Sequence, residues 1–333
     1  MKVSVVVTIY NNESTILRVV NAIRKSSYQN IEIILVDDGS TDKSLKLITS
    51  TAKNQHVFRL TENRGRVYAR NYGFEKATGD IIVNVDSDVV IQKNTIQTVV
   101  TYLTEHSEVS AVTGRVQKTS EYENFASVYK NLYMHYYFGL LPKEVNFLYG
   151  SFFAIRKTAY KKIPHSSQVK IADDTSLGQA LIYENFTIHL NKNLMVNHLK
   201  RFTLWSLIKN DFTISSDWAY LFIQYSGWTQ LFKKNTGYAH ASKGQIASIT
   251  LIGAVVFLPL LFAYSKTLAI GVSMFIGLLL VCINRTFFAY LSSQPLLFFI
   301  KAISWTILDY GIMLCGISHG IFKYMLNKKN TLV

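Results

Sequence analysis

Residues 80–88 read DIIVNVDSD, a short apolar run that ends in two acidic residues. Two earlier segments are also apolar runs that end in polar residues, VSVVVTIYNNE at 3–13 and IEIILVDDGSTD at 31–42. Because β-branched runs separated by helical stretches are typical of strands buried on both faces, they predict an α/β fold with a mainly parallel sheet flanked by helices. Ligands of such sheets bind beyond the carboxyl ends of the strands, so the polar residues after each run form the candidate site.

The same patterns divide the chain into elements and regions. The expected strands cover 3–9, 31–38, 57–60 and 80–88, and the expected helices cover 16–23, 43–52, 66–77 and 175–183. We predict three regions, which are a cytoplasmic α/β domain over 1–198, amphipathic interfacial helices over 199–244, and a transmembrane region of two to four helical segments over 245–333.

The composition excludes several classes of protein. Lys and Arg exceed Asp and Glu by 35 − 21 = 14, while 49% of the 333 residues are hydrophobic and 17% are charged. These values argue against a disordered chain, a coiled coil or a disulfide scaffold. Cys282 and Cys315 lie in apolar surroundings and indicate neither a zinc site nor a disulfide framework. The positive charge fits an anionic membrane better than nucleic acid, since no nucleic-acid motif accompanies it.

Long apolar stretches follow the α/β region. Residues 246–264 and 267–283 contain no charge, and 302–322 is mostly apolar. At ~1.5 Å of rise per residue, such helices are long enough to cross a bilayer when they stand nearly upright. The stretch 286–300 is short and contains a proline. We therefore expect two or three spanning helices. The N-terminus has no comparable apolar run, so we expect no signal peptide there.

The charges after the last stretch leave the topology open. By the positive-inside rule, the lysines there should stay cytoplasmic, which requires an even number of crossings. Three crossings would place these lysines outside. They are Lys323, Lys328 and Lys329.

The region before the first stretch has the composition of a membrane interface. Trp205, Trp218 and Trp228 are interleaved with Lys and Arg within residues 199–234. This mixture suits a helix that lies in the headgroup layer. The alternative is an ordinary amphipathic helix packed on the α/β domain.

The acids after the 80–85 run point to a cation. Asp86 and Asp88 stand two residues apart, so in an extended chain their side chains would point the same way and repel each other unless a cation lies between them. Hard oxygen ligands suit Mg²⁺ or Mn²⁺, and a cation with few protein ligands usually completes its shell with a substrate diphosphate. The alternative is a simple turn at a strand end. No GxGxxG or P-loop lysine motif is present, which argues against a dinucleotide fold or a P-loop ATPase.

Five segments in order carry a resemblance to a known family. These are VSVVVTIYNNE, LVDDGSTD, ENRGRVYARNYGFEKATGD, DSD and ADDTSLGQAL. Together they resemble family 2 glycosyltransferases with the GT-A fold, over roughly residues 1–200. The resemblance implies a nucleotide-sugar donor, a divalent metal (Mn²⁺ or Mg²⁺) and a defined set of site residues.

The resemblance first implies a nucleotide site. Its base and ribose contacts would come from Thr8, Tyr10, Glu13 and Asp38. A carboxylate opposite a uracil ring can accept its imide N–H, which favours UDP. In the next matching segment, Gly65 would allow close backbone approach and Arg70 would face the nucleotide or diphosphate. Arg66 is larger than the small residue expected at its position, and an exposed helical arginine is the alternative there.

The resemblance also implies a metal site and a sugar site. Asp86 and Asp88 match the family's DxD motif, with Asp88 as a direct metal ligand and Asp86 on ribose or metal. His198 follows a strand-like segment where relatives place a metal or diphosphate contact, although a lone histidine is more often structural. Gly150 and Ser151 would lie near the donor sugar.

The last matching segment implies the catalytic pair Asp173 and Asp174, with Asp174 as the general base. A neighbouring carboxylate would raise the pKa of that base and help it to take a proton near neutral pH. The alternative is that the two acids only cap and charge the start of helix 175–183.

These implications lead to an expected activity. We expect a membrane-bound, inverting enzyme that moves a sugar from a UDP-sugar to a hydroxyl of a membrane lipid or lipid-linked acceptor. We expect transfer of a single sugar, because the QxxRW motif of processive synthases is missing. It would be a multi-pass protein of the cell membrane with a cytoplasmic catalytic domain. The sequence leaves open its oligomeric state, the sugar and the acceptor.

Two alternatives remain. One is a polyprenyl-phosphate sugar synthase, whose acceptor is already ionised and needs no base. The other is a transporter or scaffold that uses a degenerate sugar-nucleotide domain as a sensor. Only Asp309 and His319, two ionisable residues in an apolar stretch, favour this second alternative.

Overall fold

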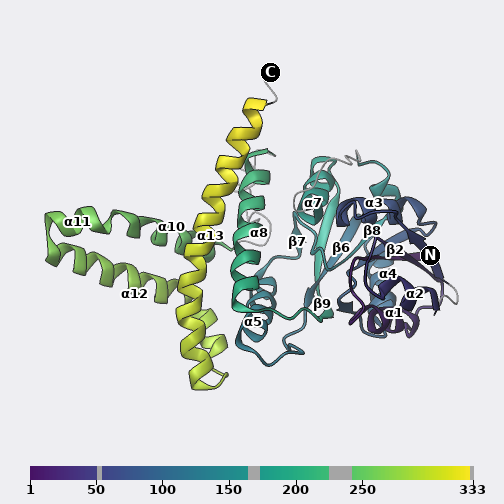
Figure 1. Cartoon of the computed structure of the whole chain (residues 1–333), viewed down its shortest axis with the longest axis horizontal. Coiled ribbons are helices and arrows are strands. Elements are labelled where there is room, and N and C mark those ends of the chain that lie inside the picture. Colours follow the sequence, from purple (N-terminus) through teal and green to yellow (C-terminus); the bar gives the residue numbers. More distant parts are fainter. Residues whose placement is uncertain (51–54, 164–172, 225–241, 331–333) are drawn as a thin grey trace. The chain divides into compact units, whose positions relative to one another are not determined.

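The computed structural model describes residues 1–50, 55–163, 173–224 and 242–330, and it divides the chain into two compact units (Figure 1). The first, here called the sheet unit, comprises Met1–Glu123 and Phe138–Arg201. The second, the helical unit, comprises Asn124–Tyr137 and Phe202–Val333. Each unit is described separately below.

The sheet unit is built on one nine-stranded sheet with the order β3-β2-β1-β4-β8-β6-β9-β5, in which β7 pairs with β9. The first four strands along this path are parallel, β8 runs antiparallel to both of its neighbours, and β6 is parallel to β9. The strands are β1 (Val3–Ile9), β2 (Ile31–Asp37), β3 (Gln55–Arg59), β4 (Ile81–Val85), β5 (Val89–Val90), β6 (Val109–Val116), β7 (Glu144–Val145), β8 (Phe152–Arg156) and β9 (Thr187–His198).

Helices accompany the strands of this unit (Figure 1). Within α1, Ile16, Val20 and Ile23 recur at helical spacing and lie in the core. The strand β1 is buried along almost its whole length, as its unbroken apolar run predicts. The helices of the unit are α1 (Ile16–Arg24), α2 (Ser44–Ser50), α3 (Arg66–Lys76), α4 (Thr95–Glu105), α6 (Lys157–Tyr160) and α7 (Asp173–Tyr183).

The expected strand over 80–88 is too long. It ends at Val85, and Asp86–Asp88 form a turn in which the N–H of Val89 donates to the carbonyl of Asp86 at 3.0 Å. The third strand starts two residues earlier than expected, at Gln55. Residues 51 and 52 of the expected helix 43–52 lie outside the described residues. The predicted mainly parallel sheet with flanking helices is confirmed.

Among its described residues, the helical unit has three helical segments that are long and apolar enough to span a membrane, at Lys243–Tyr264, Lys266–Leu291 and Leu296–Asn327. Its elements are the first part of α5 (Phe125–Leu140), α8 (Leu204–Gln224), α10 (Lys243–Ala254), the short 3₁₀ helix η1 (Val255–Phe257), α11 (Leu258–Tyr264), α12 (Lys266–Leu291) and α13 (Leu296–Asn330).

The second and third apolar segments are longer than the sequence predicts. The second extends beyond residue 283 to Leu291, and the third begins at Leu296 instead of 302. The stretch 286–300 is therefore no separate element, because Pro295 stands immediately before α13, at a helix start where its missing N–H costs nothing. Within 199–244, the described residues include all of α8 and the start of α10, while Trp228 lies outside the described residues.

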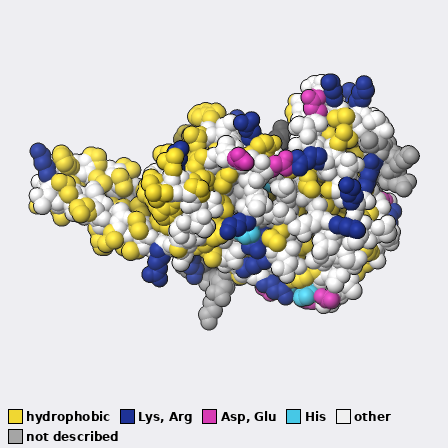
Figure 2. Space-filling view, turned by 90° about the horizontal axis from the view of Figure 1, so that it is seen from below, with side chains coloured by type: hydrophobic (Ala, Val, Ile, Leu, Met, Phe, Trp, Pro, Cys, Tyr) yellow, Lys and Arg dark blue, Asp and Glu magenta, His cyan; other side chains and the backbone are white. Residues whose placement is uncertain are grey.

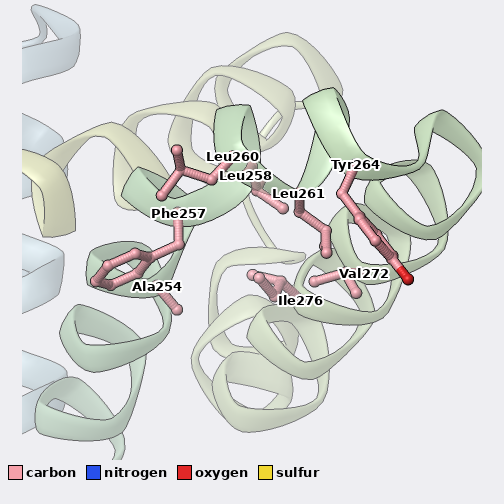
Figure 3. Close-up of a pocket in the computed structure, with 8 residues that line it drawn as sticks. All are labelled: Ala254, Phe257, Leu258, Leu260, Leu261, Tyr264, Val272 and Ile276. Atoms are coloured by element: carbon pink, nitrogen blue, oxygen red, sulfur yellow. The ribbon is translucent and has the colours of Figure 1, made fainter.

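The α11–α12 hairpin presents apolar side chains outward. Leu260 and Met274 are each 71% exposed, and Figure 2 shows hydrophobic side chains gathered over this part of the chain. Side chains of α11 and α12, among them Leu261, Val272 and Ile276, also point toward a shared apolar hollow of about 360 Å³ (Figure 3). A surface of this kind is unfavourable in water and indicates membrane association.

Candidate active site

The loops after β1 and β2 are tied to each other. Asn11 has a positive φ of 53°, which an asparagine tolerates, and its side-chain oxygen accepts the N–H of Thr41 at 2.9 Å. Glu13 accepts the N–H of Lys43 at 3.0 Å. This loop pair holds Thr8 half-buried and leaves Tyr10 46% exposed at the strand end. An exposed aromatic ring at this rim is available to stack on a planar ligand.

Asp38 organises the loop that precedes α3. It is buried, and its two carboxylate oxygens accept the N–H groups of Arg64 at 2.8 Å and Gly65 at 2.9 Å. Burial raises the pKa of Asp38 above its usual value, although these two hydrogen bonds oppose the rise. Gly65 adopts a φ of 91°, a conformation that favours glycine. Each carboxylate oxygen keeps a second lone pair, so Asp38 can still accept a hydrogen bond from a ligand.

The Asp86–Asp88 turn is joined to two other parts of the site. The hydroxyl of Ser87 donates to the side-chain oxygen of Asn12 at 2.7 Å, which fixes the turn to the loop after β1. The N–H of Asp86 donates to the carbonyl of Ser151 at 3.1 Å. The two acids lie in a turn and not in the extended chain that the sequence predicts. In this turn the charge of Asp88 raises the pKa of Asp86.

Arg70 reaches this turn from α3. Its side chain is only 4% exposed, and its Nη2 lies 3.4 Å from Oδ1 of Asp86. Burial raises the pKa of Asp86, Arg70 opposes this rise, and the charge of Asp88 adds to it. Arg70 is thus a buried cation at the acidic turn, whereas Arg66 is exposed on α3.

His198 is brought to Asp88 by strand pairing. β5 and β9 pair with Val89 opposite His198, and the N–H of Leu199 donates to the carbonyl of Asp88 at 2.7 Å. Nε2 of His198 then lies 3.3 Å from Oδ2 of Asp88. Burial raises the pKa of Asp88, but the hydrogen bond and charge of His198 outweigh it and leave the pKa below its usual value.

Asp174 is held against the backbone of Gly150. The N–H of Gly150 donates to Oδ2 of Asp174 at 2.9 Å, and the N–H of Thr175 donates to Oδ1 at 2.8 Å. A side chain at position 150 would collide with this carboxylate, which explains why glycine stands there. The helix α7 begins at Asp173, and Asp174 also serves the helix start through its bond to the N–H of Thr175. The side chain of Asp173 lies outside the described part of the chain.

Tyr149 belongs to the site, although the sequence patterns gave no sign of it. Its side chain is buried, and among the described residues its hydroxyl has no hydrogen-bond partner. Burial raises the pKa of this hydroxyl, an interaction with Ser151 opposes the rise, and the charges of the three acids Asp86, Asp88 and Asp174 add to it. The hydroxyl therefore lies within the field of all three carboxylates. An aromatic residue next to a buried strand is normally a core residue, so only the fold could reveal this position.

The donor set fits a divalent metal that shares its shell with a ligand. Asp88 and His198 lie in contact and Asp86 is close to them, which gives carboxylate oxygens and one imidazole nitrogen. No group of three or more His, Cys, Asp or Glu side chains is placed to enclose a metal within the described residues. A metal here would therefore need further oxygen ligands, which a diphosphate can provide, and the imidazole favours Mn²⁺ over Mg²⁺.

Sequence comparisons place this chain among glycosyltransferases. Residues 4–164 match the family described as Glycosyl transferase family 2. Glycosyltransferase GlyG of Streptococcus pneumoniae serotype 4 is 29% identical over 240 residues, which cover 65% of this chain and 75% of that protein. An uncharacterized glycosyltransferase of Haemophilus influenzae is 40% identical over 98 residues, which cover 28% of this chain and 39% of its own length.

Solved structures share the fold. Mannosyltransferase PcManGT from Pyrobaculum calidifontis, in complex with GDP-Man and Mn²⁺, superposes with a TM-score of 0.57 at 16% identity over 98% of this chain and 88% of its own. S. aureus TarS 1–349 in complex with UDP-GlcNAc gives a TM-score of 0.51 at 19% identity over 96% of this chain and 92% of its own. The chain is therefore a glycosyltransferase that carries a family 2 domain of the GT-A fold over residues 4–164, together with C-terminal apolar helices.

Proposed function

We propose that the protein transfers one sugar, with inversion, from a UDP-sugar to a hydroxyl group of a membrane lipid or lipid-linked acceptor. The observation that carries the proposal is the connection between Asp174 and the acidic turn. Asp174 is bonded to Gly150, and the carbonyl of the next residue, Ser151, accepts the N–H of Asp86. One short backbone segment thus holds the candidate base and the candidate metal ligands in a fixed relation.

The donor nucleotide would lie at the ends of β1 and β2. Thr8 lies near the end of β1, Tyr10 and Glu13 stand on the loop after it, and the buried Asp38 stands on the loop after β2. A remaining lone pair of Asp38 is suited to accept the imide N–H of uracil, which is the reason to propose UDP. Gly65 offers a backbone without a side chain beside this position.

The diphosphate would lie at the acidic turn. Asp88 would bind Mn²⁺ or Mg²⁺, with His198 and Asp86 as further ligands, and the bound metal would neutralise charge on the departing nucleotide. Arg70 holds Asp86 in place and adds a positive charge from the protein side. Ser151 would contact the donor sugar from the neighbouring strand end.

In the proposed reaction, Asp174 takes the proton of the acceptor hydroxyl as that oxygen attacks the anomeric carbon. The bond from the anomeric carbon to the diphosphate oxygen breaks, and its electron pair leaves with the nucleotide. Attack opposite the leaving group inverts the anomeric centre. Two N–H donors fix the carboxylate of Asp174, so the base is preorganised for this transfer. Asp173, next to it, would complete the pair.

Apolar helices favour an acceptor in the membrane. Three helices long and apolar enough to span a bilayer would keep the enzyme where lipid acceptors are, with the catalytic domain on the cytoplasmic side of the cell membrane. The two residues that had suggested a transporter have packing roles within the helical unit. His319 lies 2.9 Å from the hydroxyl of Ser216, and Asp309 interacts with Asp211.

The decisive experiment compares Asp174→Asn with Asp80→Asn. Asp80 is an exposed carboxylate that accepts the N–H of Lys2 just before β4, at the other end of that strand from the acidic turn, so its loss should change activity by less than about threefold. Loss of a general base should lower transfer by about 10²–10⁴-fold. The purified protein would be given Mn²⁺, UDP-sugars and membrane lipid extract, and glycolipid would be measured by mass spectrometry.

The affinity for UDP should be the same in Asp174→Asn as in the unchanged protein, because Asp174 does not belong to the proposed nucleotide site. Near-normal transfer by this variant, with a product that mild acid cleaves, would contradict a hydroxyl acceptor. That result would instead support the polyprenyl-phosphate alternative. Absence of product with every UDP-sugar, but not with other nucleotide-sugars, would contradict the UDP assignment alone.

A further inference from the structure

The helical unit contains a cleft that no step of the proposed reaction uses. It has a volume of about 530 Å³ and lies between the starts of α5 and α8 and one face of α13. Phe125, Leu204, Ile300 and Leu308 supply most of its apolar wall. Leu204, Ile300 and Leu308 are each more than half exposed. The cleft is thus open to the medium that surrounds the apolar helix α13.

Two of the residues that line this cleft carry a buried polar atom that has no partner among the described residues. These atoms are the side-chain oxygen of Asn124 and the indole Nε1 of Trp305. The amide nitrogen of Asn124 donates to the carbonyl of Phe202 at 2.6 Å, which fixes the orientation of the amide and leaves its oxygen unused. A buried polar group without a partner is destabilising, so an acceptor and a donor on residues of one cleft point to a polar ligand.

A positive charge stands at the same cleft. Lys301 is exposed, lines the cleft, and has no ion pair within the described ranges. It lies five residues after the start of α13, a candidate membrane span that begins at Leu296. A cation near the end of a spanning helix lies at the depth of lipid headgroups.

We propose that this cleft binds the headgroup of an anionic membrane lipid. The phosphate accepts hydrogen bonds from Lys301 and from the indole N–H of Trp305, and a headgroup hydroxyl donates to the oxygen of Asn124. The first methylene groups of the lipid chains cover Leu204 and Leu308. A lipid fits better than free phosphate because the exposed wall is apolar and gains from contact with chains.

The proposal is tested on the full-length protein in detergent by native mass spectrometry. Added phosphatidylglycerol should remain bound, and phosphatidylcholine should bind more weakly. Lys301→Gln should weaken phosphatidylglycerol binding roughly fivefold, since one lysine contributes about 1 kcal/mol at an anionic surface. Trp305→Phe keeps an aromatic side chain, although a smaller one, but removes the indole N–H donor and should weaken binding severalfold. Lys266→Gln, at the exposed start of α12, is the matched control and should leave binding unchanged.

Other outcomes would overturn the proposal. Equal binding of phosphatidylglycerol and phosphatidylcholine would contradict an anionic headgroup site. Equal effects of Lys301→Gln and Lys266→Gln, in proteins with unchanged circular dichroism, would contradict this location. Displacement of the lipid by millimolar inorganic phosphate alone would show that the cleft is a phosphate site and not a lipid site. These measurements use no sugar donor, so their result is independent of the proposed glycosyl transfer.

Discussion

At the residue scale, the acidic turn keeps two neighbouring carboxylates in different environments. Burial and Asp88 raise the pKa of Asp86, although Arg70 opposes the rise, while His198 lowers the pKa of Asp88 in spite of burial. Two carboxylates that lie close together repel each other when both are ionised. When their pKa values differ, one acid can stay neutral while the other carries the charge. Asp88 is therefore the acid that more readily carries a negative charge, and its role as a direct metal ligand stays a prediction.

Tyr149→Phe gives a prediction at the same scale. The substitution removes a buried hydroxyl without a protein partner in the described part of the chain, so the thermal stability should stay the same or rise slightly. If the hydroxyl bonds to substrate beside the three carboxylates, kcat should fall about tenfold, which corresponds to one hydrogen bond of roughly 1.4 kcal/mol. The two readouts are kcat with saturating donor and the melting temperature in detergent.

Tyr160→Phe provides the control for Tyr149→Phe. It removes another buried tyrosine hydroxyl, but Tyr160 packs on Phe74 and belongs to no part of the candidate site. Its kcat should be unchanged. A Tyr149→Phe enzyme with full activity would assign that tyrosine to the core alone.

Sequence patterns could predict acids and miss the tyrosine for a physical reason. Asp38, Asp86 and Asp88 follow apolar runs directly, so local periodicity is enough to place them at strand ends. The position of Tyr149 depends on contacts with elements more than 20 residues away, and no local pattern encodes such contacts. The same holds for the bonds from Asp38 to Arg64 and Gly65.

At the element scale, Glu32 connects three parts of the sheet unit. Its carboxylate accepts the N–H of Thr78 at 2.6 Å and that of Gly79 at 3.2 Å, just before β4. It also bonds to Ser4 on β1 and lies 2.8 Å from Nζ of Lys2. Burial raises the pKa of Glu32, but these hydrogen bonds outweigh it and lower the pKa from 4.5 to about 2.

The lowered pKa of Glu32 predicts a pH dependence of stability. Because the folded-state pKa lies below the unfolded one, the stabilisation is complete above about pH 4.5 and is lost as the pH falls toward 2. The shift corresponds to roughly 3 kcal/mol, and screening at the half-exposed Lys2 reduces this to about 2 kcal/mol. Thermal unfolding of Glu32→Gln between pH 3 and 7 should show a deficit at pH 7 that shrinks below pH 4.5. A deficit that stays constant down to pH 3 would argue against this linkage, and Glu105→Gln, at an exposed helix end, should show no deficit.

The packing of α8 on α13 gives a second prediction at this scale. A Cβ at Gly320 would lie 2.8 Å from the carbonyl carbon of Ser216 and closer still to its oxygen, whereas a Cβ at Gly311 would meet nothing within 4 Å. Gly320→Ala must push the helices apart and should destabilise the helical unit by about 1–3 kcal/mol. Gly311→Ala, in the same helix, should be neutral or stabilising by up to about 1 kcal/mol. Equal melting temperatures of the two variants in detergent would show that the helices adapt without cost.

At the scale of the whole molecule, the units do not follow the three consecutive regions that the sequence suggested. Asn124–Tyr137 lies inside the predicted domain 1–198, but it packs in the helical unit. There, fully buried Tyr129 contacts Thr306 at 3.0 Å, and Lys130 pairs with Asp211 in the interior. The residues of α5 are apolar or aromatic on several faces, and such a pattern says that a helix is buried without saying against what.

Because residues 124–137 pack in the helical unit, we can predict how a truncated protein behaves. A chain that ends at Arg201 would retain α5 but lose every helix that covers Tyr129, Tyr133 and their neighbours in the helical core. Each aromatic side chain buries roughly 150–250 Å², so the exposed patch would exceed the few hundred Å² that a soluble monomer tolerates. We expect residues 1–201 to aggregate in size-exclusion chromatography without detergent. Replacing Tyr129, Leu132 and Tyr133 by Ser in the truncated chain should restore a monomer, because these side chains face the lost partners and not the sheet core. If residues 1–201 were monomeric without these changes, α5 would have to be stable without the helical unit, and the boundary at residue 198 would stand.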